Sequence, residues 1–171
     1  MLVVGAGSVA ERKVTSLVAA RADVRVVAPQ ATDEIRRLAA EKTLEWEARA
    51  FEDADVDGSW LVIASTADAE LQRRVVDSAA ARRIFVVAVD DPAHASAYSG
   101  AVVRRPPFTI AISSSGATPA LTRLVREVVE HVLPSEEWIE HAKRLRAKWF
   151  AEGTPAGDRF AELVKEIKGR G

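Results

Sequence analysis

Short apolar runs alternate with segments of helical periodicity along the first half of the chain. The apolar runs are rich in valine and isoleucine, which is typical of strands. The segments between them carry one apolar face each, which is typical of helices that cover a sheet. This alternation predicts a parallel α/β sheet. The expected strands are 2–4, 24–28, 44–48, 60–64 and 84–89, and the expected helices are 9–20, 32–41 (capped by Thr32 or Asp33) and 68–81.

The order of these strands predicts where a ligand would bind. The run from Ile84 to Val89 is almost entirely apolar, so we expect a central strand that is covered on both faces. A Rossmann-like, doubly wound order of 3-2-1-4-5 brings the carboxyl ends of strands one, two, four and five around one crevice. The residues at those ends are Gly5, Ala28-Pro29, Ser65-Thr66 and Asp90.

The pattern changes after Asp90-Asp91-Pro92. Two apolar runs, 101–103 and 108–112, flank Pro106-Pro107 and predict a small antiparallel β unit. Apolar stripes at helical spacing fill the rest of the chain, and Thr-Pro pairs at 118–119 and 154–155 predict helix starts.

Composition excludes several kinds of chemistry. The chain has 171 residues and no cysteine, so thiolate catalysis, cysteine-bound zinc and iron–sulfur clusters are excluded. Its three histidines, His94, His131 and His141, are not paired in sequence, so we expect no metal site. The net charge of −1 and the lack of a long apolar run predict no nucleic-acid partner and no membrane span. We expect a cytoplasmic protein.

The segment Gly5-Ala6-Gly7-Ser8-Val9-Ala10 matches the dinucleotide-binding pattern G-x-G-x-x-A between a strand and a helix. The first glycine allows a tight turn, and the second lets a pyrophosphate approach the helix N-terminus. The acidic residue that usually holds a ribose hydroxyl is missing from 28–30, and no arginine stands there for a 2′-phosphate. We therefore expect the backbone or Gln30 to hold the ribose, with NAD favoured over NADP.

Asp90 directly follows an apolar strand. We expect it to be partly desolvated near the nicotinamide, where a carboxylate could take a proton. The alternative is an aspartate that only shapes the turn before Pro92.

Five segments are specific in combination. They are 3–13 (VVGAGSVAERK), 26–29 (VVAP), 62–66 (VIAST), 89–92 (VDDP) and 108–126 (FTIAISSSGATPALTRLVR), which continues to Leu133-Pro134. In order and spacing they resemble the siroheme synthases and stand-alone precorrin-2 dehydrogenases. The chain departs from that family at Val87, where an asparagine is common, and it begins at the first strand without the usual lead-in, which suggests a trimmed or misassigned start.

The resemblance implies a homodimer that oxidises precorrin-2, an acidic tetrapyrrole, to sirohydrochlorin with NAD. It implies a Rossmann NAD-binding domain over 1–91, a dimerisation β region over 92–117 and a helical C-terminal domain over 118–171. It matches Asp90 to the catalytic aspartate. It matches Ser8-Val9 and Pro29-Gln30 to the family's cofactor contacts. From the glycine motif and the strand ends we expect Gly5, Gly7 and Thr66 in the same cofactor site.

The substrate's carboxylates call for cationic side chains and helix N-termini. Arg12 and Arg123 are the expected binders, with Lys13, Arg104, Arg105 and Arg126 also available, and Ser114 matches the family serine. Two alternatives stay open: a bifunctional enzyme that is also a sirohydrochlorin ferrochelatase, and a non-catalytic NAD-sensing module.

Overall fold

The computed structural model describes residues 1–115 and 117–168, so Gly116 of the serine-rich motif and the last residues of the expected helical region lie outside the described residues. The chain divides into two compact units. The first holds residues 1–99 with 113–118, and the second holds 100–112 with the segment from 119 onward. The three-part division expected from sequence stays a prediction.

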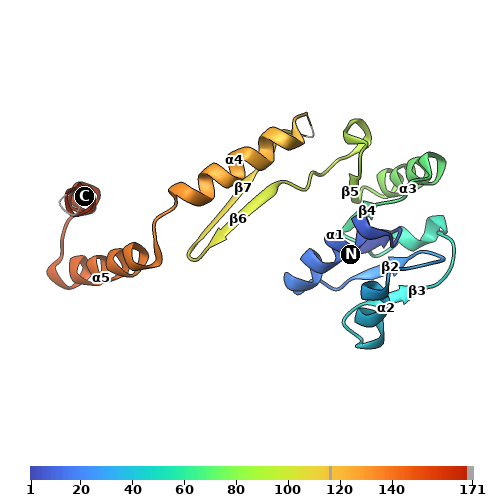
Figure 1. The fold of residues 1–171 in the computed structure, drawn as a ribbon, viewed down its shortest axis with the longest axis horizontal. Coiled ribbons are helices and arrows are strands. Elements are labelled where there is room, and N and C mark those ends of the chain that lie inside the picture. Colours follow the sequence, from blue (N-terminus) through green and yellow to red (C-terminus); the bar gives the residue numbers. More distant parts are fainter. Residues whose placement is uncertain (116, 169–171) are drawn as a thin grey trace. The chain divides into compact units, whose positions relative to one another are not determined.

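The first unit contains a five-stranded parallel sheet in the order β3-β2-β1-β4-β5 (Figure 1). Val3 of β1 pairs with Val26 of β2 on one side and with Ile63 of β4 on the other. The parallel α/β class and the 3-2-1-4-5 order are therefore confirmed. The strands are β1 (Leu2–Val4), β2 (Arg25–Val27), β3 (Glu45–Glu47), β4 (Leu61–Ala64) and β5 (Phe85–Ala88).

The expectation that the fifth strand is central is wrong, because β5 lies at an edge of the sheet. Its last three residues are nevertheless buried. The chain folds back along the free edge, where the amides of Ser96 and Ala97 donate to the Val86 carbonyl at 2.9 and 3.0 Å. The apolar run of the fifth strand thus indicated burial correctly. The returning loop covers the free edge of β5, where a central strand would have a second neighbouring strand.

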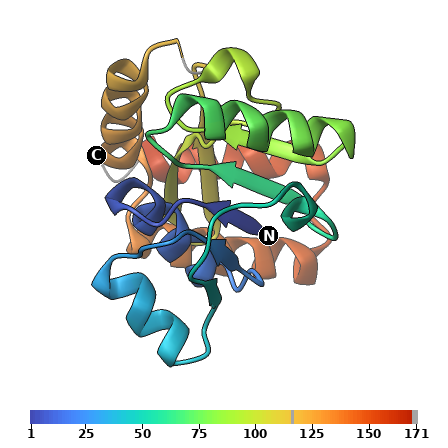
Figure 2. The ribbon, with the colours of Figure 1, turned by 90° about the vertical axis from the view of Figure 1, so that its right-hand side faces the viewer.

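Helices cover both faces of the sheet. Val14 of α1 (Ser8–Ala19) and Ile35 of α2 (Asp33–Ala40) pack into one core cluster. Val56 of the 3-10 turn η1 (Asp53–Val56) and Val75 of α3 (Ala69–Ala81) pack into the other. Figure 2 accordingly shows α3 (green) and α2 (blue) on opposite sides of the sheet. Thr32, not Asp33, caps α2, because its hydroxyl accepts from the Ile35 amide.

The second unit combines a β hairpin with three helices. Strands β6 (Ala101–Arg105) and β7 (Phe108–Ile112) pair antiparallel, as expected. They are followed by α4 (Pro119–Val132), α5 (Glu136–Glu152) and α6 (Ala156–Lys168). None of the helices in the described part of the chain is long and apolar enough to span a membrane.

Candidate functional site

The two glycines of the loop between β1 and α1 occupy different environments. Gly5 has φ +99°, and a Cβ there would lie 2.0 Å from the Ser65 carbonyl oxygen of the loop after β4. Gly7 has φ −80° and caps α1, and a Cβ there would meet nothing within 4 Å. Gly5 is therefore required by the fold, whereas the space in front of Gly7 is open to a ligand.

The N-terminus of α1 faces this open space. The first hydrogen bond of the helix runs from the Glu11 amide to the Gly7 carbonyl at 2.9 Å. The amides of Ser8, Val9 and Ala10 precede it and therefore have no partner within the helix. Together with the helix dipole, such amides form an anion site that suits a pyrophosphate.

The loop after β2 is fixed beside the glycine loop. The Trp46 indole Nε1 donates to the Ala28 carbonyl at 3.0 Å, and the Thr32 amide donates to the Ala6 carbonyl at 3.1 Å. Pro29 and Gln30 lie between these anchors and are exposed. Their backbone and the Gln30 amide can therefore reach a ligand that crosses this edge of the sheet.

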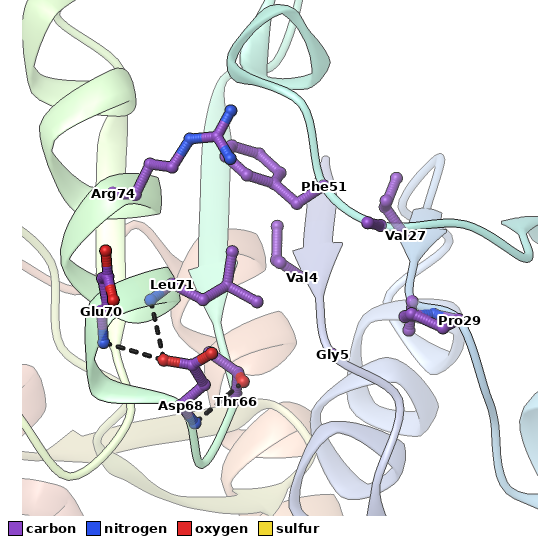
Figure 3. Close-up of a pocket in the computed structure, with 12 residues that line it drawn as sticks. Val4, Gly5, Val27, Pro29, Phe51, Thr66, Asp68, Glu70, Leu71 and Arg74 are labelled. Carbon is purple, nitrogen blue, oxygen red and sulfur yellow. Dashed lines mark hydrogen bonds between the residues drawn. The ribbon is translucent and has the colours of Figure 1, made fainter.

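A cavity of about 330 Å³ opens at the carboxyl ends of β1, β2 and β4 (Figure 3). It includes Gly5, Pro29 and Thr66, which the sequence had placed at one crevice. Thr66 is engaged locally, since its hydroxyl accepts from the Asp68 amide at 3.2 Å. The remaining lining residues are Val4, Val27, Ala28, Ala50, Phe51, Asp68, Glu70, Leu71 and Arg74.

Sequence reasoning missed the far wall of this cavity. Figure 3 shows Arg74 beside Phe51, with the guanidinium 5.6 Å from the ring centroid. Asp53 holds Arg74 there through an Nε–Oδ1 contact of 2.7 Å. Phe51 follows the carboxyl end of β3, so extending the strand-end argument to that strand would have found it. Leu71 and Arg74 lie on α3 and carry no local signal.

Asp90 follows β5 at φ +60°. The expected partial desolvation is wrong, because Asp90 is exposed. Lys13 on α1 lies within its electrostatic reach. Burial and the charge of Arg12 lower the pKa of Lys13, while the charge of Asp90 opposes that shift. A carboxylate and a partly buried ammonium thus lie within electrostatic range of each other.

The expected substrate residues divide between the two units. Arg12 is exposed on α1 in the first unit. Ser114 belongs to the same unit and is partly buried, and its hydroxyl accepts from the Thr118 amide at 3.2 Å. Arg123 belongs to the second unit, where it pairs with Glu127 at 3.1 Å.

Two other candidate arginines are engaged within the second unit. The Arg105 guanidinium donates to the carbonyls of Leu133 and Glu130 at the end of α4, at 2.8 and 2.9 Å. Arg126 pairs with Glu130 at 2.9 Å. Among the described residues, no group of three or more histidine, aspartate or glutamate side chains could hold a metal ion.

Comparisons with known proteins show what this chain is similar to. The chain is 47% identical over 135 residues to siroheme synthase 1 of Cronobacter sakazakii. This match covers 79% of this chain and 29% of that protein. It is 40% identical over 149 residues to the siroheme synthase of Photorhabdus laumondii, and this match covers 87% of this chain and 31% of that protein. The chain thus spans less than a third of these curated relatives, and the expected resemblance to siroheme synthases is confirmed.

Among solved structures, SirC, a precorrin-2 dehydrogenase, shares the fold. The TM-score is 0.74 at 21% identity, and the match covers 97% of this chain and 83% of that one. Residues 1–101 match the family described as putative NAD(P)-binding. They contain the glycine loop, the open space at Gly7 and the adjoining cavity. The chain therefore belongs to the putative NAD(P)-binding family.

Proposed function

We propose that this protein oxidises precorrin-2 to sirohydrochlorin with NAD. The observation that carries the proposal is the extent of its similarity to siroheme synthases. That similarity covers 135 residues at 47% identity, whereas the NAD(P)-binding match ends at residue 101. Similarity that continues beyond the nucleotide-binding part supports a shared substrate as well as a shared cofactor.

The cofactor site would run across the carboxyl ends of β1, β2 and β4. The open space at Gly7 and the amides of Ser8 and Val9 suit the pyrophosphate. The cavity wall of Phe51 and Leu71 suits the flat, largely apolar adenine.

The remaining cofactor contacts would come from Gly5, Pro29, Gln30 and Thr66. The Gln30 side chain is polar and exposed beside this edge of the sheet, and the segment 28–30 carries no cation for a 2′-phosphate. This arrangement supports NAD over NADP.

Asp90 is the proposed general base. The oxidation removes a hydride and a proton from precorrin-2, and bound NAD supplies the hydride acceptor. The chain must hold the donor carbon within roughly 3–3.5 Å of that acceptor. The exposed Asp90 carboxylate is available to accept the proton, a contribution of about 10²–10⁴-fold. Arg12, Ser114 and Arg123 are the proposed contacts for the substrate's carboxylates.

Iron insertion is the second candidate, with ferrous iron as a substrate. The names of the relatives favour it, because siroheme is the iron-containing product. The carboxylate of Asp90 could accept protons from the macrocycle in that step as well. Incubating the protein with sirohydrochlorin and Fe²⁺ tests this activity separately from NAD.

A homodimer and a cytoplasmic location complete the proposal. The apolar stripe of α4 supports the dimer, since its side chains remain exposed within their own unit. They are Leu121, Leu124, Val125, Val128 and Val132. Exposed apolar stripes of this kind mark interaction surfaces.

Anaerobic incubation with precorrin-2 and NAD tests the principal activity. NADH should form together with the sirohydrochlorin spectrum, and Asp90→Asn should slow both at least ~100-fold, because an amide cannot accept the proton. The variant should bind NAD normally. Asp33→Asn, which changes an exposed aspartate on α2, serves as the control. Absence of NADH formation by the wild-type protein would overturn the proposal.

A further inference from the structure

The residues on both sides of Asp90 are tied to helix α3. On the preceding side, the Gln72 amide Nε2 donates to the Val89 carbonyl at 2.6 Å, and Gln72 is buried. On the following side, the Asp91 carboxylate lies 2.8 Å from His94 Nδ1. The other ring nitrogen, Nε2, lies 3.1 Å from Arg73 Nη1. Consecutive residues of one helix thus hold both neighbours of Asp90.

The chemistry of Arg73 determines the direction of these hydrogen bonds. A guanidinium can only donate, so His94 Nε2 must accept from it. The ring proton then lies on Nδ1 and is donated to Asp91. Arg73, His94 and Asp91 therefore form a directed chain of hydrogen bonds. The carboxylate of Asp77 also lies beside Arg73, at 3.8 Å from its Nε.

Asp90 adopts a backbone conformation that needs such support. Its φ of +60° lies in the left-handed region, which is disfavoured for residues other than glycine. The loop is fixed further on, where the Val86 amide donates to Ser96 Oγ at 2.8 Å. Residues that their surroundings hold in the left-handed backbone region cluster at functional sites.

We infer that the chain Arg73–His94–Asp91 is a positioning device that keeps the Asp90 carboxylate at the reacting face of the nicotinamide. This inference rests on the proposed role of Asp90 as the base. His94 and Arg73 act through the loop and touch neither substrate nor cofactor. Loss of His94 frees the residue after Asp90, so the carboxylate leaves its reactive orientation while the glycine loop is unchanged.

A double-mutant cycle between His94 and Asp90 tests the inference. His94→Ala should lower kcat for precorrin-2 oxidation about 10-fold, since small displacements of a reacting group are costly, and should leave the Kd for NAD unchanged. In the Asp90→Asn background, His94→Ala should have no further effect, because the group it positions is already disabled. His94→Asn keeps a donor near the Nδ1 position and should recover part of the loss. Arg82→Gln, which removes the arginine directly after α3 from an exposed pair with Asp57, is the matched control.

The outcomes separate this inference from the proposed function. If Asp90→Asn is fully active, Asp90 is not the base, and both its proposed role and the positioning inference are wrong. If Asp90→Asn is impaired and His94→Ala is fully active, only the positioning role is wrong. If His94→Ala lowers kcat by the same factor in both backgrounds, His94 acts independently of Asp90 and the inference is overturned.

Discussion

Gly5 and Gly7 illustrate how neighbouring residues of one motif meet different demands. A side chain at Gly5 would collide with the Ser65 carbonyl, so Gly5→Ala should lower the free energy of unfolding by about 2–4 kcal/mol. A side chain at Gly7 meets open space, so Gly7→Val should fold with a loss of no more than about 1 kcal/mol. It should nevertheless lose NAD binding, because the valine would occupy the pyrophosphate's approach path. Denaturant titration and calorimetric NAD titration measure the two effects, and equal NAD affinity for Gly7→Val and the wild-type protein would contradict the cofactor assignment.

The turn η1 depends on one buried carboxylate, Asp55, that accepts from Arg49 Nη1 at 2.8 Å and from the Glu52 amide at 2.8 Å. The hydrogen bond from Arg49 is the main cause that holds the pKa of Asp55 below its ordinary value of 3.8. The ionised Asp55 carboxylate therefore stabilises the folded protein fully at pH values above its ordinary pKa. This stabilisation is lost as the pH falls through the lower pKa that Asp55 has in the folded protein. Asp55→Asn should cost about 1.5–3 kcal/mol at pH 7 and flatten the acid dependence of unfolding. Asp57→Asn, which breaks only an exposed ion pair, should cost about 0–1 kcal/mol, so equal losses in urea titrations of the two variants would contradict this account.

Dimer formation would cover apolar surface that neither unit buries by itself. Leu124 and Val128 of α4 are 55% and 54% exposed, although their spacing is that of a core-facing stripe. Light scattering should therefore find a dimer at micromolar concentration. Leu124→Glu should shift the protein toward the monomer, because a charge would have to be desolvated in the interface. Lys148→Ala, at an exposed position on α5, should leave the dimer intact, and a monomeric wild-type protein would refute the proposal.

The sequence by itself determined the parallel sheet, its strand order, the glycine loop and the antiparallel pairing of the hairpin. These features depend on local periodicity and on steric rules that act within a few residues. Tertiary structure alone decided that Asp90 is exposed, and that Leu71 and Arg74 of α3 line a cavity with Phe51. The contacts of Arg73 with His94 and of Gln72 with Val89 likewise join segments 21 and 17 residues apart. Such contacts form only when the sheet brings α3 beside the loop after β5, so no local pattern in the chain encodes them.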